Sequence, residues 1–395
     1  MNTFFLLEIF SLGFAQTDEP TGDEITNPKI VGVNKIKPHS LLLPYDNAEQ
    51  AQQDKAEDSP YYQSLNGSWK FAFSENPASR PQNFYATDYD ISDWDEIEVP
   101  GDWQMQGYDL AIYLNHPYEF TTAEGASQLP LATDSREVRT PNPPAVPENW
   151  NPVGSYRRSF TVPANWTDRE VILHFGGVKT AFYVWVNGQY VGYSEDSKTP
   201  AEWSITDYLQ KGENTVACEV YRVASGSYLE CQDFWRLSGI ERDVYLYALP
   251  KLSLQDLTVR ADLDENYQNG LFSAVVTMAN HSNENLSDRS LMLQLLDASG
   301  NAVYEEEEQR VSVDGNSEAT FTFNTEVENC ASWTAETPNL YTLLITYQGS
   351  SDNSSVVSAT QVGFRNVAID NGQLLVNGQA VLVKGVNRHE HHAEF

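Results

Sequence analysis

The sequence has 395 residues, 41% of them hydrophobic, with nine Trp, 21 Tyr and 17 Phe, which is enough for two or three packed domains and excludes a disordered chain. With 56 acidic against 24 basic residues the formal net charge is −32, which repels nucleic acid and anionic membranes, so we expect neither as a partner. A neutral substrate such as a sugar is compatible with this charge, although solubility or a salty habitat explains the charge without any binding role.

Residues 1–16 resemble a secretory leader. They are rich in Phe, Leu and Ile and end in the small-residue signal Phe14-Ala15-Gln16, but no Lys or Arg precedes the apolar core and Glu8 lies inside it. We expect a signal peptide over 1–16, which slightly favours a periplasmic or secreted location over the cytoplasm. No later segment reaches 18 consecutive apolar residues, so no membrane span is expected. The three cysteines are too few for a disulfide framework and are predicted to be free thiols.

Residues 17–58 are acidic and rich in Asn, Pro and Gln, and we expect an arm that lies on the folded body, with a short helix near 48–56. From 59 to 248 short alternating runs are separated by Gly, Pro, Asn and Asp, which is typical of a β-sandwich. Trp69, Phe71 and Phe73 alternate along one strand after Asn66-Gly67. Asn187-Gly188, between two apolar runs, predicts a hairpin with a type I′ turn.

A second all-β unit is predicted over 249–363, where five runs in about a hundred residues indicate an immunoglobulin-like sandwich. Residues 364–395 then contain two Asn-Gly turns and the run Val-Leu-Val-Lys-Gly-Val over 381–386. That run leads into the polar cluster 387–392, as the end of a buried parallel strand does when it delivers side chains to a site. Because the sequence stops three residues later, we expect it to be the front portion of a larger enzyme.

Six ordered motifs carry a resemblance to a known family. They are GDWQMQGYD (101–109), NPVGSYRR (151–158), GYSEDSKTPAE (192–202), GSYLECQDFWR (226–236), WTAETPNLY (333–341) and KGVNRHEHH (384–392). On these stretches the chain resembles the beginning of a glycoside hydrolase family 2 β-galactosidase. The resemblance implies a mainly β fold: a jelly-roll sugar-binding sandwich, an immunoglobulin-like β-sandwich, and then the first strand of a (β/α)₈ barrel.

By this resemblance the parent enzyme is a retaining β-galactosidase that acts on lactose and other β-galactosides. Such enzymes use two carboxyl groups about 5–5.5 Å apart, and the family places both glutamates on later barrel strands. We therefore expect no catalytic residue in this chain and no hydrolysis by it alone. The resemblance also implies Mg²⁺, with ligands beyond Phe395, and Na⁺. It further implies a homo-oligomer of the full-length parent.

The resemblance assigns five residues to the galactose subsite. His389 is expected to reach the sugar hydroxyls, with Arg388 and His392 in support. Asp196 is expected both to bind Na⁺ and to touch the sugar, since a hard cation prefers oxygen ligands. Asp102 stands where the family often has Asn, and this exchange replaces an amide that donates and accepts with an acceptor-only carboxylate.

Several readings compete with these assignments. The cluster 389–392 could be a metal site or a tag remnant, although its spacing is not that of a helical zinc motif. Asp196 could be a turn or cap residue and Asp102 an Asx-turn residue. Trp103, Trp185 and Trp235 are expected to pack in cores or loops rather than to stack on sugars. For the whole chain, the alternatives are a non-catalytic carbohydrate-binding protein and a family 2 enzyme of another glycoside specificity.

Overall fold

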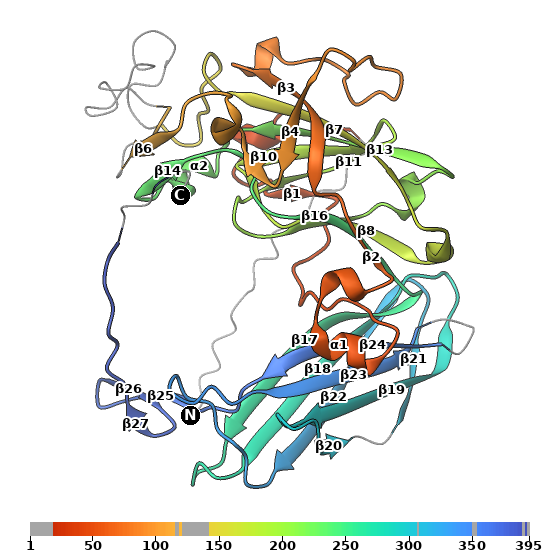
Figure 1. Ribbon diagram of the computed structural model, residues 1–395, viewed down its shortest axis with the longest axis vertical. Helices are drawn as coiled ribbons and strands as arrows, with labels where there is room; N and C mark the ends of the chain where they lie inside the picture. Colours follow the sequence, from red (N-terminus) through yellow and green to blue (C-terminus); the bar gives the residue numbers. More distant parts are fainter. Residues whose placement is uncertain are drawn as a thin grey trace, which may run out of the picture.

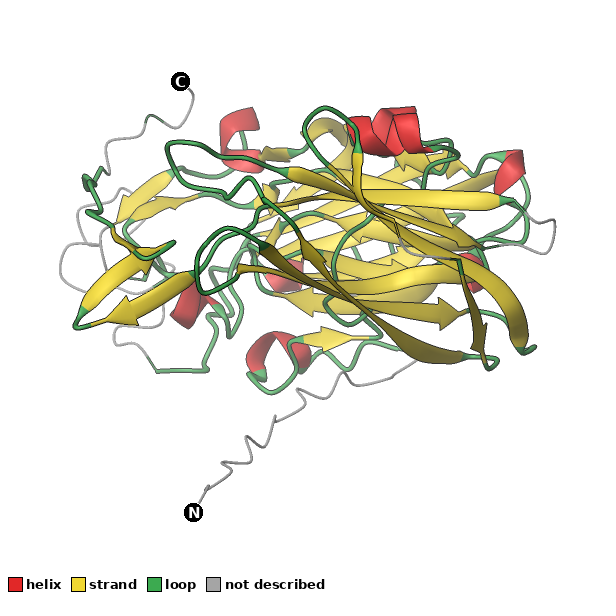
Figure 2. Cartoon of the chain, turned by 90° about the horizontal axis from the view of Figure 1, so that it is seen from below, coloured by secondary structure: helices red, strands yellow, loops and turns green. Residues whose placement is uncertain are grey.

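A computed structural model describes residues 19–114, 118–120, 142–305, 308–349, 354–388 and 392. Two β units lie one above the other along the long axis, the first from red to green and the second from cyan to blue (Figure 1). Strands dominate both units, and the described helices are short pieces between them (Figure 2). None of these helices is long and apolar enough to cross a membrane.

The first unit is a sandwich of two antiparallel sheets. The larger has seven strands in the order β1 (Gly32–Val33), β11 (Gln189–Glu195), β10 (Ala181–Val186), β13 (Glu213–Tyr221), β7 (Val153–Thr161), β3 (Gly67–Ser74) and β4 (Asp95–Val99). The smaller has four strands in the order β12 (Ala201–Ser204), β8 (Glu170–Phe175), β16 (Val244–Leu249) and β2 (Tyr62–Ser64). Alternation along these strands gives each sheet an inner and an outer face.

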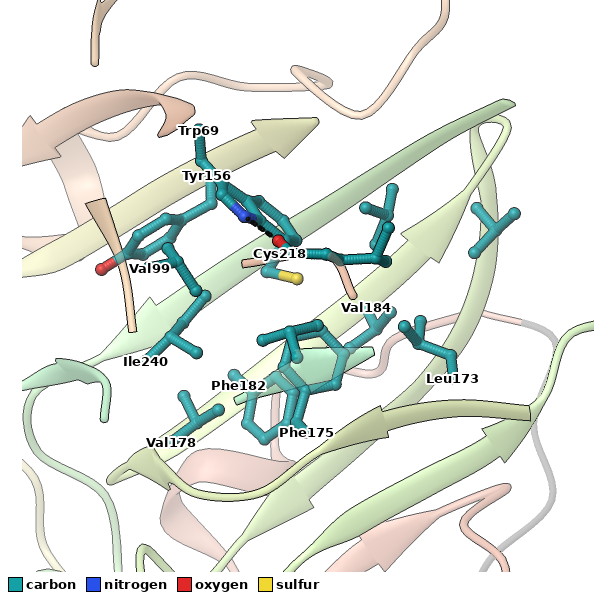
Figure 3. Packing of buried hydrophobic residues seen from close by; sticks show 14 of the residues in the cluster. Trp69, Val99, Tyr156, Leu173, Phe175, Val178, Phe182, Val184, Cys218 and Ile240 are labelled. Carbon is teal, nitrogen blue, oxygen red and sulfur yellow. Dashed lines mark hydrogen bonds between the residues drawn. The ribbon is translucent and has the colours of Figure 1, made fainter. Parts of the chain in front are cut away.

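The inner faces of the two sheets enclose one hydrophobic core. Phe175 and Leu173 from β8 face Phe182 and Val184 from β10 in this core (Figure 3). Gly154 in β7 leaves room for the ring of Trp103, because a Cβ at this position would lie 2.7 Å from that ring. Trp103 and Trp185 are both buried, as predicted.

The arm before residue 59 covers the outer faces. It contains η1 (Glu24–Thr26), β1, α1 (Ala48–Gln53) and η2 (Ala56–Asp58), so the helix predicted near 48–56 is confirmed. Ile25 and Val33 pack on the outer face of the larger sheet, and Ile36 and Leu43 pack on that of the smaller sheet. The arm also reaches the second unit, where Tyr45 pairs with Val357.

Short elements connect the strands of this unit. They are η3 (Pro77–Ser79), η4 (Trp103–Gln106), η6 (Ala164–Trp166), η7 (Thr206–Tyr208), α2 (Ser227–Glu230), the pair β6 (Ile112–Leu114) and β14 (Phe234–Arg236), and the three-stranded sheet β5 (Gly101–Asp102), β15 (Gly239–Ile240) and β9 (Val178–Lys179). The β10–β11 hairpin closes through Asn187 and Gly188, whose φ values of 51° and 80° confirm the predicted turn.

The second unit is also a sandwich. One sheet contains β17 (Leu252–Leu263), β18 (Gly270–Asn280) and β22 (Ser317–Val327), and the other contains β20 (Ala302–Glu305), β19 (Leu286–Leu296), β23 (Tyr341–Gln348) and β24 (Ser355–Val362), with β21 (Gln309–Val313) paired to β19. Alternate apolar residues from both sheets form a separate core. The prediction of a mainly β chain with two successive sandwiches is therefore confirmed.

The C-terminal segment begins with β25 (Val367–Asp370), β26 (Gln373–Val376) and β27 (Gln379–Ala380), joined by the two expected Asn-Gly turns. Residues 381–388 then extend away from this sheet toward β6 and β14 (Figure 1). The prediction of a buried strand over 381–386 is wrong for this structure. In the described part of the chain no neighbouring strand pairs with the run, and Leu382, Val383 and Val386 are exposed.

Candidate functional site

The small sheet β5-β15-β9 brings together one polar residue that was predicted, Asp102, and one that was not, Lys179. Gly239 of β15 is in register with Asp102 on one side and with Lys179 on the other. A Cβ at Gly239 would lie 2.5 Å from the carbonyl oxygen of Gly101, and its φ is +146°, so only glycine allows this close approach. Asp102 and Lys179 thus lie on either side of β15.

Asp102 carries a strongly perturbed carboxyl group. Burial, followed by the negative charge of Glu241, raises its pKa to about 6. Its Oδ1 atom is buried and has no hydrogen-bond partner among the described residues. The side chain makes no capping hydrogen bond to the following 3₁₀ turn, so the structure gives no support to the Asx-turn reading.

Two lysines balance part of the negative charge around Asp102. Lys179 is buried, its ammonium lies 5.2 Å from the centre of the Phe234 ring, and burial lowers its pKa. Lys198 forms an ion pair of 2.5 Å with Glu241. Sequence reasoning missed Lys179 and Glu241. A charged residue inside the apolar run 178–186 was the available signal for Lys179, whereas nothing local pointed to Glu241.

Asp196 follows β11 in a tight turn. Its φ is +106°, its Oδ1 accepts a 3.1 Å hydrogen bond from the backbone N–H of Lys198, and its Oδ2 accepts a 2.6 Å hydrogen bond from the hydroxyl of Thr199. Asp196 is therefore a turn residue, as the competing interpretation states. Each of its carboxylate oxygens keeps a second lone pair, and the residue is exposed.

A buried carboxylate, Glu195, and a half-buried one, Glu230, fix the loop that carries Asp196. Glu230 at the end of α2 accepts hydrogen bonds from the backbone N–H (2.7 Å) and the hydroxyl (2.6 Å) of Ser197. In the opposite direction, Glu195 accepts hydrogen bonds from the Ser225 hydroxyl at 2.9 Å and from the N–H of Gly226. These hydrogen bonds hold the turn at residues 195–197 against the turn at residues 225–230. Burial raises the pKa of both glutamates.

A cavity of about 650 Å³ opens beside this loop. Its walls come from the loop, from α2 and from the arm, which contributes Lys35 and His39. Asp196 and Glu230 both line it. Electrostatic interactions of Lys179 with Glu230 and of Lys198 with Asp102 connect this cavity with the β5-β15-β9 sheet. We call the group Asp102, Lys179, Asp196, Lys198, Glu230 and Glu241 the acidic rim.

The other three predicted site residues are not part of this arrangement. Arg388 and His392 are exposed, and within the described ranges no hydrogen bond or ion pair joins Arg388 to Asp102 or Asp196. His389 lies outside the described residues. In the described part of the chain no group of three or more His, Cys, Asp or Glu residues could hold a metal ion.

Comparisons with protein families place these features in context. The sugar binding domain of glycosyl hydrolases family 2 matches residues 62–250, a second family 2 domain matches 252–365, and the family's TIM barrel domain matches 367–395. Solved structures with a similar fold include a β-glucuronidase 2 of Bacteroides uniformis, with a TM-score of 0.66 and 21% identity over 84% of this chain and 36% of that one.

Curated relatives are more similar in sequence. A β-galactosidase of Priestia megaterium is 43% identical over 92% of this chain and 34% of its own length, and one of Clostridium acetobutylicum is 39% identical over 94% of this chain and 38% of its own length. The chain thus spans about a third of the length of the curated relatives it matches. With three successive domain matches over 62–395 and relatives of this similarity, the chain belongs to glycoside hydrolase family 2.

Proposed function

We propose that this chain supplies part of the galactose subsite of a retaining β-galactosidase, which hydrolyses terminal non-reducing β-D-galactose residues of lactose and other β-galactosides. The observation that carries the proposal is the acidic rim, where Lys198 interacts with Asp102 and donates its backbone N–H to Asp196. Carboxylates and ammonium groups are suited to accept and donate hydrogen bonds to sugar hydroxyls. The names of the curated relatives support the same substrate class.

The charge of the rim favours a neutral sugar over an anionic one. Four carboxyl groups, Asp102, Asp196, Glu230 and Glu241, stand against the two lysines. A glucuronide would bring a further carboxylate into this negative field, which raises its binding free energy relative to that of a galactoside. The rim therefore favours galactosides, although some structural neighbours are β-glucuronidases.

Catalysis itself requires groups that we place elsewhere in the parent protein. In this proposal both catalytic glutamates and the Mg²⁺ ligands lie outside residues 1–395, while His389, Arg388 and His392 add sugar contacts once a barrel packs around them. Asp196 contributes one ligand to a Na⁺ ion. The full-length parent is a homo-oligomer. The chain alone binds galactosides and does not cleave them.

Binding to the 395-residue chain tests the proposal. Methyl β-D-galactoside and methyl β-D-glucuronide are titrated by calorimetry or ligand-detected NMR, with the galactoside expected to bind more tightly. Asp196→Asn should weaken galactoside binding about tenfold, since a hydrogen bond to a charged group contributes about 1.5 kcal/mol or more. Asp314→Asn, an exposed aspartate of the second sandwich, is the matched control and should bind as the parent does.

Two results would count against the proposal. If the glucuronide binds as tightly as the galactoside, or if Asp196→Asn has no effect on galactoside binding, the rim is not the galactose subsite. Hydrolysis of lactose by the purified 395-residue chain would show that the catalytic carboxylates lie within residues 1–395 and not beyond them. Both assays use the chain as it stands.

A further inference from the structure

The outer face of the seven-stranded sheet contains a second cavity, of about 630 Å³. It lies under residues 20–26 of the arm, between the loop around Arg80 and the loop at 146–151, over strands β10 and β13. It shares no lining residue with the cavity beside Asp196. A volume of this size is within the range of about 300–1,000 Å³ that small-ligand sites occupy.

Its floor is a charged network in an otherwise aromatic surface. Glu219 of β13 is buried, forms a 3.0 Å ion pair with Arg80 and accepts a 2.6 Å hydrogen bond from the hydroxyl of Tyr221. Burial raises the pKa of Glu219. Ser155, its cross-strand neighbour on the same face, is fully buried, and its hydroxyl has no hydrogen-bond partner within the described residues.

Stability alone does not explain this floor. A buried ion pair is on average no more stabilising than well-packed apolar residues of similar size. Several neighbours on the same face are apolar or aromatic, among them Ala217, Tyr183 and Trp185, so an apolar residue at 219 would pack against them. A carboxylate and a guanidinium that both line a cavity instead provide acceptors and donors for a ligand.

One wall of the cavity offers an aromatic surface. Tyr85 is half-buried and stacks on Trp185 with ring centroids 4.7 Å apart and an interplanar angle of 4°. Its hydroxyl donates a 3.1 Å hydrogen bond to the side chain of Asn83. A rigid, stacked tyrosine beside paired polar groups suits a ligand with one apolar face and several hydroxyls.

We infer that this cavity binds a neutral saccharide, independently of the acidic rim. Arg80 and Glu219 cancel each other's charge, so the floor favours neither an anion nor a cation and pairs best with a polyhydroxylated neutral molecule. Glu219 and Arg80 would bind hydroxyls, and Tyr85 would pack against the apolar face of the sugar ring. This inference does not depend on the proposed galactosidase function, because its residues and cavity are separate.

The test titrates lactose into the 395-residue chain by ligand-detected NMR and by the fluorescence of its tryptophans. Tyr85→Ala and Glu219→Gln should each weaken lactose binding about tenfold at this cavity. Asp196→Asn leaves this binding unchanged because it acts on the other cavity. Tyr267→Ala, a 42% exposed tyrosine of the second sandwich, is the matched control, and circular dichroism reports whether each variant is folded.

Each outcome decides between the two sites. Loss of lactose binding in Tyr85→Ala alone supports the inference, and a partial loss in both Tyr85→Ala and Asp196→Asn also supports it, because lactose then binds at both cavities. Loss in Asp196→Asn alone overturns the inference and leaves the proposed galactose subsite intact. No binding at all, or binding unchanged in both Tyr85→Ala and Glu219→Gln, also overturns it. If Glu219→Gln fails to fold, Tyr85→Ala decides alone, since Tyr85 is only half-buried.

Discussion

Asp102 has the most unusual chemistry of the predicted site residues. Its folded pKa of about 6 lies above the ordinary aspartate value of 3.8, chiefly because of burial. The folded state therefore favours the neutral carboxyl group. The stability that this group contributes is present below pH 3.8 and is lost as the pH rises through 6. Between these values Asp102 changes from a group that can donate a hydrogen bond to one that only accepts.

Replacing this acid with its neutral amide should therefore stabilise the protein at neutral pH. Asp102→Asn is expected to raise the free energy of unfolding by about 1–3 kcal/mol at pH 8 and to change it little at pH 4, because the ionised carboxylate is then absent from both proteins. Urea unfolding at the two pH values measures the difference. Asp314→Asn serves as the control, and an equal effect of Asp102→Asn at both pH values would contradict the expectation.

At this scale the sequence predicts some site residues better than others. Asp102 and Asp196 stand in recognisable motifs, and Lys198 interacts with both of them. Glu230 could not be predicted as the residue that fixes the Asp196 loop. Its two hydrogen bonds to Ser197 cross 33 positions of the sequence, and such contacts arise from the packing of two turns rather than from a local pattern.

The arm is held on the smaller sheet by a histidine–carboxylate–histidine group. Glu202 of β12 accepts 2.7 Å hydrogen bonds from His39 of the arm and from His174 of β8, and a 3.1 Å hydrogen bond from Tyr247. Burial opposes ionisation of Glu202, but the bonds to the two histidines outweigh it and lower its pKa to about 2. Burial also opposes protonation of His39, yet its bond to Glu202 raises its pKa overall.

These shifts predict a pH optimum for the docked arm. A lowered carboxylate pKa gives stability above about pH 4.5 that is lost toward pH 2, and a raised histidine pKa gives stability below pH 6.5 that is lost as the pH rises further. Glu202→Gln should therefore lower the free energy of unfolding by roughly 3 kcal/mol at pH 6 and by much less at pH 2.5.

Denaturant unfolding across this pH range tests the Glu202 prediction. Glu213→Gln, an exposed glutamate on the neighbouring sheet, should behave like the parent protein at every pH. A loss of stability in Glu202→Gln that is the same at pH 2.5 and pH 6 would show that the ionised carboxylate is not its source.

Gly154 lies in a tightly packed part of the first sandwich, which predicts that a larger residue there destabilises the protein. A methyl group at Gly154 would lie 2.7 Å from Trp103 and 2.9 Å from Phe71, so Gly154→Ala should cost about 1–3 kcal/mol of stability through overpacking. Gly385→Ala is the matched control, because a Cβ there meets nothing within 4 Å. Thermal unfolding measures both, and a Gly154→Ala protein as stable as the parent would show that the core can shift to accept it.

Elements with a local cause are predicted from the sequence, and those that need a partner are not. Asn187-Gly188 forms its turn because both residues tolerate positive φ. The apolar run 381–386 looks like a strand, but a strand exists only through repeated hydrogen bonds to a neighbour. Among the described residues the run makes one such bond, from the N–H of Val381 to the carbonyl oxygen of Leu374. The arm was expected to lie on the body, yet the sequence did not reveal that it contacts both sandwiches.

For the whole molecule, the net charge of −32 should make stability depend on salt. Screening of the repulsion between carboxylates is expected to raise the unfolding temperature as ionic strength increases. If Asp196 binds sodium, NaCl should raise the unfolding temperature more than KCl does at the same ionic strength. Asp196→Asn should then abolish the difference between the two salts. Equal effects of the two salts on the parent protein would contradict sodium binding by this chain.

The exposed C-terminal run should govern how the whole chain associates. Leu382, Val383 and Val386 are 79%, 75% and 93% exposed, and contiguous apolar side chains on an unpaired extended segment promote self-association. Replacing all three with Ser should shift the chain toward the monomer without lowering its unfolding temperature, because none of the three packs in either core. Sedimentation velocity over a range of concentrations measures this shift. Leu271→Ser, at an exposed position of the second sandwich, is the control, and association that persists in the triple variant would place the contact on another surface.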